Sequence, residues 1–226
     1  MARSRSLARA RGPRREGVSR SIDPRVQSSE RLLDATAELL GEHSAIDVSL
    51  SEIARRSGLN SALVKYYFGN KEGLLLALLK RDAERAMGAL DHLLAMQVTA
   101  AHKLKIHISG IINAYFRSPY LNRLIHHLIE SGGQESSRAV TSMFVEPMLA
   151  AYKAIIDQGV AEGSLRPTDP ALLYFSLVGA CDHIFHAAYS VRSALGETQI
   201  TEEIKQRYIA HVTEVHLNGL LASRKG

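Results

Sequence analysis

Apolar residues recur along this chain with the spacing of helices. After Pro24, the residues Val26, Leu33, Ala37 and Leu40 fall on one helical face, and apolar positions keep a spacing near 3.6 further along the chain. The alternation with a period of two that marks half-buried strands is absent. The later helical stretches are 71 into the 90s, 102–117, 119–131, 136–161, 170–193 and 200–222. The pattern predicts an all-α fold of about nine helices.

Helix boundaries are marked by residues that stop or start helices. Gly41 ends the first predicted helix, and Ser118-Pro119 and Gly196 separate later ones. Pro147 lies inside the 136–161 pattern. Because proline has no amide hydrogen to donate, that helix is expected to kink or to begin near it.

Two short helices precede the long ones. The first begins after Ser49, a favourable N-cap, and Glu52 three residues later completes a capping box. Gly58 suits the turn that follows, since glycine adopts a positive φ without strain. Either Asn60 or Ser61 caps the second helix. Two short helices joined in this way form a helix-turn-helix.

The side chains of this stretch divide into a buried set and an outward set. The set suited to fill the angle between the two helices is Ile53, Ala54, Leu59 and Val64. The set left outward on the second helix is Asn60, Ser61, Leu63, Lys65 and Tyr66. A short helix of this kind presents its N-terminal end to the major groove of DNA, where side chains reach base edges.

Charge supports a nucleic-acid partner. From Ile53 to Lys71 the chain has four basic residues and no carboxylate. Lys65 is suited to guanine O6 and N7 or to a phosphate, and Tyr66 to a phosphate oxygen. Lys71 begins the next helix, where a positive charge opposes the helix dipole, so that a phosphate explains it better than helix stability does.

Three aromatic residues, Tyr66, Tyr67 and Phe68, follow Lys65 directly. We expect Phe68 to anchor the turn in the core and one or both tyrosines to face the DNA backbone. The alternative interpretation is three core rings behind a solvated lysine. It requires two buried hydroxyl groups to find partners.

The motif in this region resembles the DNA-binding domain of the TetR family of bacterial transcription regulators over residues 26–78. That family has a capped helix, A-x-x-x-G-[VL]-x, a short helix ending in L-Y-Y-H-F, and x-[ND]-K-[ED]-x-L; this chain reads IARRSGLNSALVKYYFGNKEGLL. Two positions depart from the pattern. Lys65 stands where tyrosine is usual and Tyr67 where histidine is common, so no base preference is carried over.

The resemblance implies which residues face DNA and how the protein assembles. The positions that match DNA-facing ones are Ser51, Asn60, Ser61, Leu63, Lys65, Tyr66, Tyr67 and Lys71. Family members are homodimers whose two recognition helices lie roughly 34–36 Å apart and read an inverted repeat. The expected partners are therefore double-stranded operator DNA, a second copy of the chain and a small-molecule effector of unknown identity.

Composition divides the chain into three parts. Residues 1–24 carry seven arginines against one glutamate and one aspartate, a charge of +5 that equals the net charge of all 226 residues. We expect a disordered basic arm there, either a solubilising segment or one that neutralises phosphates or enters a minor groove. Residues 25–80 form the helix-turn-helix domain, and residues 81–226 form the ligand-binding and dimerisation domain.

The larger half is expected to hold the dimer interface and the effector pocket. By the resemblance, the helices at about 170–193 and 200–222 pair with their mates in a four-helix bundle. Small residues such as Gly179 and Ala180 permit close approach there. Polar residues on otherwise apolar helices are the candidate ligand contacts: His107, Asn113, Tyr115, Arg117, His126, His127, Tyr152, Asp182, His183 and His186. The run GSLRPTDPALLYFSLVGA also resembles, more loosely, family members near the pyrimidine-utilisation regulator RutR.

Other classes of protein find less support. Asp182, His183 and His186 share a helical face, but zinc usually needs three or four convergent ligands, so neither a metal nor a cofactor is predicted. An all-helical enzyme is the remote alternative, and the motifs GxGxxG, GxxxxGK[ST] and GxSxG are missing. The single cysteine, Cys181, and the lack of a long apolar run or a secretory signal predict a cytoplasmic protein. The sequence favours a ligand-released repressor; an activator or a DNA-organising factor of the same fold is the alternative.

Overall fold

The described part of the protein is helical throughout. The computed structural model describes residues 24–43 and 45–221. The helices in this part are α1 (Pro24–Glu42), α2 (Leu50–Ser57), α3 (Ala62–Phe68), α4 (Lys71–Ala95), α5 (Ala100–Arg117), α6 (Leu121–Glu130), α7 (Gly133–Val140), the π-helical segment η1 (Thr141–Val145), α8 (Glu146–Ala161), α9 (Pro170–His186), α10 (Ala188–Leu195) and α11 (Glu202–Leu220). Within these ranges no β-strand forms, and an isolated antiparallel bridge joins Leu165 to Leu221. The all-α prediction is confirmed.

The nine predicted helices correspond to these elements, with two of them subdivided. The stretch predicted over 136–161 is α7, η1 and α8 in succession, and the one over 170–193 is α9 and α10. The π-helical turn comes directly before Pro147, where the amide of Glu146 donates to the carbonyl of Thr141, five residues back. Proline lacks an amide hydrogen and crowds the preceding turn, so the widened turn accommodates it.

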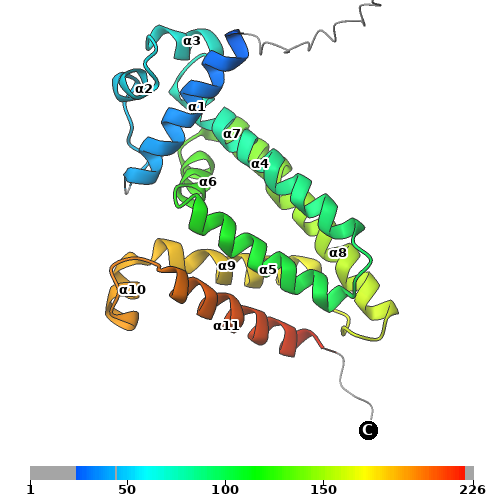
Figure 1. Ribbon diagram of the computed structural model, residues 1–226. Helices are drawn as coiled ribbons and strands as arrows, with labels where there is room; N and C mark the ends of the chain where they lie inside the picture. Colours follow the sequence, from blue (N-terminus) through cyan, green and yellow to red (C-terminus); the bar gives the residue numbers. More distant parts are fainter. Residues whose placement is uncertain (1–23, 44, 222–226) are drawn as a thin grey trace, which may run out of the picture.

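The helices form two bodies joined along α4 (Figure 1). Helices α1, α2 and α3 pack together at one end, and α4 runs from there to the far corner of the molecule beside α8. Helices α5, α9 and α11 form the second layer, in which α11 lies along α5. The predicted basic arm, residues 1–24, lies outside the described residues except for Pro24.

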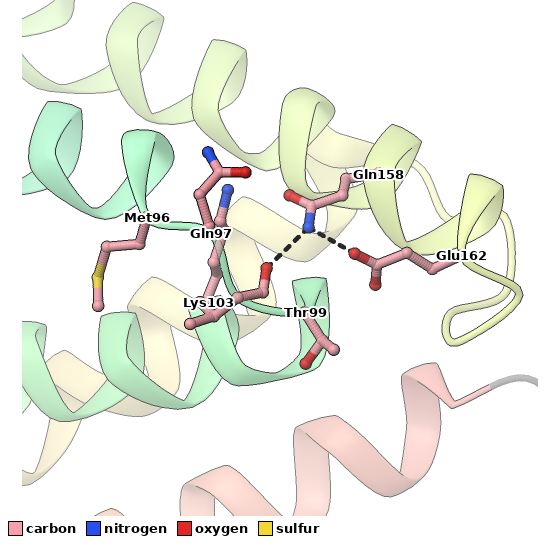
Figure 2. A pocket seen from close by; sticks show the side chains of 7 residues that line it. Met96, Gln97, Thr99, Lys103, Gln158 and Glu162 are labelled. Carbon is pink, nitrogen blue, oxygen red and sulfur yellow. Dashed lines mark hydrogen bonds between the residues drawn. The ribbon is translucent and has the colours of Figure 1, made fainter.

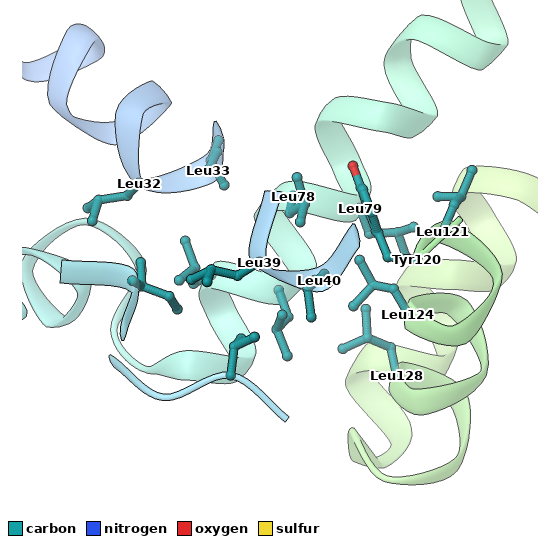
Figure 3. Close-up of a cluster of buried hydrophobic side chains, with 14 of the residues drawn as sticks. Leu32, Leu33, Leu39, Leu40, Leu78, Leu79, Tyr120, Leu121, Leu124 and Leu128 are labelled. Carbon is teal, nitrogen blue, oxygen red and sulfur yellow. The ribbon is translucent and has the colours of Figure 1, made fainter. Parts of the chain in front are cut away.

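Each body has its own hydrophobic core. The first core joins α1 and α4 to α6, as Figure 3 shows, through Leu32, Leu33, Leu39, Leu40, Leu78, Leu79, Tyr120, Leu121, Leu124 and Leu128. The second core joins α5, α8, α9 and α11, with Tyr152 fully buried at its centre. Helix α6 therefore belongs by packing to the same core as the short N-terminal helices, although it follows α5 in the chain.

One helical stretch passes a simple test for a membrane span. Within the described residues, Gly133–Ala161 is long and apolar enough to cross a bilayer by length and composition, and 33% of its most apolar window is buried inside the protein. A helix packed in a protein core passes the same test, so the observation is weak evidence for a membrane.

Candidate nucleic-acid interface

Helix α2 begins where the sequence predicts. The Ser49 hydroxyl accepts from the amide of Glu52 at 3.2 Å, and the Glu52 carboxylate accepts from the amide of Ser49 at 2.8 Å. The Ser49 hydroxyl and amide hold the pKa of Glu52 below its usual range. Both bonds of the predicted capping box are present, and they fix the direction in which the chain enters α2.

Gly58 forms the turn between α2 and α3. Its φ is +67°, in the left-handed region that glycine adopts most readily. A Cβ added there would lie 3.2 Å from a guanidinium nitrogen of Arg31. That guanidinium reaches from α1 and donates to the carbonyl of Ser57 at 2.6 Å. The turn is therefore held by its own backbone and by a contact from α1.

Helix α3 has one buried face and one exposed face. Val64 is fully buried, and Leu63, Tyr67 and Phe68 are half-buried against the first core. On the opposite face Lys65 is exposed and Tyr66 is 65% exposed. The interpretation of three core rings fails for Tyr66, since only the two rings after it reach the core.

Neighbouring rings of the aromatic row pack against each other, and the first pair is edge to face. The rings of Tyr66 and Tyr67 lie 4.9 Å apart at an interplanar angle of 79°, and those of Tyr67 and Phe68 lie 6.2 Å apart. Edge-to-face contacts are favourable for aromatic pairs. Phe68 and Tyr67 therefore hold Tyr66 in place while its face stays open to solvent.

The basic residues of this stretch separate into paired and unpaired ones. Arg56 lies beside Glu42 at 2.7 Å and Glu38 at 3.3 Å, both from α1. Arg56 therefore holds α2 against α1. Its charge is neutralised within the protein, so we do not assign it to DNA binding. Among the described residues neither Lys65 nor Lys71 forms a side-chain ion pair or hydrogen bond.

The other predicted DNA-facing residues occupy helix starts. Asn60 is exposed, and its side-chain oxygen accepts from the amide of Ala62 at 2.8 Å, which caps α3. Ser61 is exposed and makes no capping bond with its side chain. Ser51 is exposed in the first turn of α2, and Lys71 is half-buried at the start of α4. Asn60 is thus the residue that caps α3, and Ser61 leaves its hydroxyl uncommitted.

A set of contacts that holds α6 in the first core escaped the sequence analysis. The guanidinium of Arg123, on α6, donates to the carbonyls of Leu40 and His43 at 2.8 Å each, where α1 ends. The hydroxyl of Tyr120 donates to Asp82 of α4 at 2.8 Å. These contacts link α6 and its N-terminal end to both α1 and α4 across more than thirty residues of sequence. Neither Arg123 nor Tyr120 belongs to a sequence motif from which its partner could be predicted.

The predicted ligand residues of the C-terminal body include a buried pair. His107 is 9% exposed, and its Nε2 lies 3.1 Å from the hydroxyl of the fully buried Tyr152. Burial lowers the pKa of His107 to about 4 and raises the pKa of Tyr152. Tyr115 is buried against Phe185, and burial likewise raises its pKa. At neutral pH all three are uncharged core groups.

The remaining predicted ligand residues are spread over several helices. Asn113 donates to the carbonyl of Ser109 within α5. His126 on α6 lies 3.9 Å from Asp182 on α9. Exposed Arg117 and His183 and half-buried His127 line none of the described pockets, and the side chain of His186 lies outside the described part of the structure. Among the described residues no three His, Cys, Asp or Glu side chains gather as metal ligands do.

An open pocket lies where α4 turns into α5. Its volume is about 530 Å³, and it is lined by residues 96–99, Lys103, Gln158 and Glu162 (Figure 2). None of these residues was among the predicted ligand contacts. Their local sequence carries no signal for a pocket, because Gln158 of α8 and its C-cap Glu162 join the others from about sixty residues away.

Models of two protein families match the chain. The model described as bacterial regulatory proteins, tetR family, matches residues 32–78, and the one described as tetracyclin repressor-like, C-terminal domain, matches residues 97–226. The first covers α2 and α3, and the second covers more than half of the chain.

Individual relatives match more narrowly. The HTH-type transcriptional regulator BetI of Rhizobium meliloti (strain 1021) is 35% identical over 89 residues, which are 38% of this chain and 41% of that protein. BetI of Agrobacterium fabrum is 41% identical over 63 residues, or 26% of this chain and 31% of that protein. The chain thus matches less than half of the length of these relatives.

Solved structures match over a greater length. The regulator FadR of Bacillus subtilis, in complex with stearoyl-CoA, superimposes with a TM-score of 0.67 at 19% identity, covering 84% of this chain and 98% of that one. A TetR/AcrR-family regulator of Thermobifida fusca gives 0.67 at 21% identity, covering 85% and 98%. At these identities the likeness shows the fold alone. With the helix-turn-helix at α2 and α3 and the match of its C-terminal part, the chain belongs to the TetR family of bacterial regulatory proteins.

Proposed function

We propose that this protein is a ligand-responsive transcriptional regulator that binds an inverted-repeat operator as a homodimer and is released by a small-molecule effector. Repression is the mode we propose, since residues 97–226 match a tetracyclin repressor-like domain. The recognition surface consists of Ser51, Asn60, Ser61, Leu63, Lys65, Tyr66, Tyr67 and Lys71.

One observation supports the recognition surface above all. Lys65 and Tyr66 are exposed together on α3, while Val64, the residue directly before them, is fully buried. An exposed tyrosine beside an uncommitted lysine adds nothing to the core, whereas it suits a helix that contacts base edges and phosphates. Leu63 and Tyr67 are half-buried, so we assign them a positioning part at the edge of this surface.

The dimer interface we propose is the outer face of α9 and α11. Leu172 and Phe175 are 68% and 71% exposed on α9, and Val215 is 55% exposed on α11. Gly179 lies on the same side of α9 and is exposed as well. Large apolar side chains with this exposure indicate a surface that a partner covers. A second copy is the partner because the family assembles as dimers through its last two long helices.

Release of DNA requires a change that reaches α3. Helix α4 starts three residues after Phe68 and ends at the C-terminal body, so any tilt of α4 moves α3 relative to its mate. A coupling free energy of about 1–3 kcal/mol changes affinity about 5- to 150-fold. The effector must bind the two arrangements unequally, or the equilibrium does not shift.

The decisive experiment replaces Lys65 and Tyr66 together by alanine. Both side chains are exposed, so the far-UV circular dichroism spectrum and the melting temperature should match those of the unchanged protein. Operator affinity, measured by fluorescence anisotropy on DNA obtained by binding-site selection, should be abolished. Lys105→Ala removes a comparable exposed charge from α5 and should leave affinity unchanged. Operator binding that survives the double substitution would refute the proposed surface.

A further inference from the structure

The pocket at the α4–α5 turn contains a buried cation with unused hydrogen-bond donors. Lys103 is 6% exposed, and its Nζ donates to the carbonyl of Leu94 at 2.7 Å. No carboxylate among the described residues lies within ion-pair distance of it. An ammonium group carries three N–H donors, so two remain without a protein acceptor. The charge of Glu162 acts on Lys103 from beyond ion-pair distance, so the two remaining N–H donors are what makes this site suited to an acceptor from outside.

The carboxylate nearest in the pocket is already committed. Glu162 accepts from the amide of Ala100 at 3.0 Å, from the hydroxyl of Ser164 at 3.0 Å and from the side chain of Gln158. The hydrogen bond from Gln158, followed by the Ala100 amide, holds the pKa of Glu162 below its usual range, so it stays charged. It therefore caps the start of α5 and holds α8 against it. Its charge already acts on Lys103, so it disfavours a dianion in the same pocket more than a monoanion.

The rest of the lining is part polar and part apolar. In Figure 2 the Lys103 side chain rises beside Gln97, with Thr99 on the first turn of α5 and Met96 on the other side. The Thr99 oxygen accepts from the amide of His102, which leaves its hydroxyl hydrogen free to donate. Met96 and Val98 are half-buried and offer apolar contact. A volume of about 530 Å³ is within the range of small-molecule sites.

We propose that this pocket binds a small aliphatic carboxylic acid, with the carboxylate on the Lys103 ammonium and the alkyl chain against Met96 and Val98. The regulatory part of this proposal rests on the proposed function: the acid is the effector. Helix α4 has 25 residues and, at about 1.5 Å per residue, spans about 37 Å. The carbonyl of Leu94 in its last turn accepts from Lys103, and the residues directly after it line the pocket. Because the other end of α4 follows α3, a ligand that shifts this end of α4 can move the recognition helix.

Direct binding is tested without DNA. We would titrate the full chain with hexanoate by isothermal calorimetry and repeat the titration with hexanamide, which has the same shape and no charge. Hexanoate should bind at least tenfold more tightly than hexanamide. Lys103→Met keeps the length of the side chain and removes the charge, and it should weaken hexanoate at least tenfold. Lys105→Met removes an exposed lysine from the same helix and should change nothing.

Two further measurements keep the outcome decisive. If circular dichroism shows that Lys103→Met does not fold, Gln97→Glu decides, since this exposed position adds a carboxylate at the rim and should weaken hexanoate at least tenfold. Inorganic phosphate is titrated in parallel. Equal affinity for hexanoate and hexanamide, indifference to both substitutions, or binding of phosphate alone would overturn the carboxylate site.

The regulatory part has a separate measurement. Hexanoate at saturation should weaken operator affinity at least fivefold in the unchanged protein, while Lys103→Met or Gln97→Glu protein should respond only at concentrations at least tenfold higher. Hexanoate binding without any change in operator affinity would overturn the effector assignment and leave the pocket in place. If no DNA is bound at all while hexanoate still binds, the proposed function fails and the carboxylate site stands.

Discussion

The contact of Arg123 with the end of α1 offers the sharpest test of how α6 is held against the N-terminal helices. Arg123→Met removes three hydrogen bonds: two, each 2.8 Å long, to the carbonyls of Leu40 and His43, which hold α6 to the end of α1, and one of 2.9 Å to the nearby carbonyl of Pro119. A hydrogen bond that involves a charged group contributes about 1.5–3 kcal/mol, and a cation at a helix C-terminus contributes about 0.3–1 kcal/mol. The two bonds to α1 therefore suggest a gross decrease in stability of about 3–6 kcal/mol.

Two effects reduce that decrease. The Nε of Arg123 is buried without a hydrogen-bond partner, and removing an unsatisfied donor recovers about 1–3 kcal/mol. The two carbonyls lie near the end of α1, where water can replace part of the missing bonding. The expected net decrease in the free energy of unfolding is about 2 kcal/mol, which is large against the total stability of a typical domain.

The assay is urea unfolding followed by far-UV circular dichroism. Arg117→Met, at an exposed position on α5, is the matched control and should stay within about 0.5 kcal/mol of the unchanged protein. A decrease below about 0.5 kcal/mol for Arg123→Met, the same size as the control, would mean that the contact carries no energy and that α6 rests on α1 by apolar packing alone.

Three more predictions concern assembly, pH and the basic arm. Phe175→Glu should convert the dimer to a monomer in sedimentation velocity, because it places a charge in the proposed interface at a position that is 71% exposed in the single chain. Val160→Glu on α8 is the control and should remain dimeric. A dimeric Phe175→Glu protein contradicts the interface. His107 has a folded pKa of about 4 against 6.5 when unfolded, so the unfolded state binds more protons between these values and stability falls as pH drops from about 6.5 toward 4, by at most about 3 kcal/mol. His107→Gln should flatten the dependence of the unfolding free energy on pH over that range, and an equally steep dependence would show that His107 is protonated as easily as in the unfolded chain. Deletion of residues 1–22, which lie outside the described residues, should reduce the slope of log affinity against log salt by about 0.9 for each phosphate that the arm neutralises, and an unchanged slope would show that the arm does not touch DNA.

Local patterns determined the secondary structure and the recognition motif. The capping box at Ser49 and Glu52, the positive φ of Gly58 and the disturbance before Pro147 each depend on residues within a few positions of one another. Such features can be predicted because they arise from backbone geometry and neighbouring side chains alone. The apolar spacing likewise predicted every long helix, and the match of IARRSGLNSALVKYYFGNKEGLL predicted the family.

Contacts between distant segments were decided only by the tertiary structure. Arg56 pairs with Glu38 and Glu42, which lie 18 and 14 residues away in the chain and which α1 brings to it. Arg123 and Lys103 have no motif, and their partners lie on other helices or at the end of one.

The same limit applies to the effector pocket. Polar residues on apolar helices, such as His107 and Tyr152, are predicted ligand contacts, and the sequence could not show that the fold joins these two by a hydrogen bond in the core. Periodicity tells which face of a helix is buried, because that depends on the helix itself; it does not tell which helix covers that face or where a gap is left, because that depends on the packing of all the helices together.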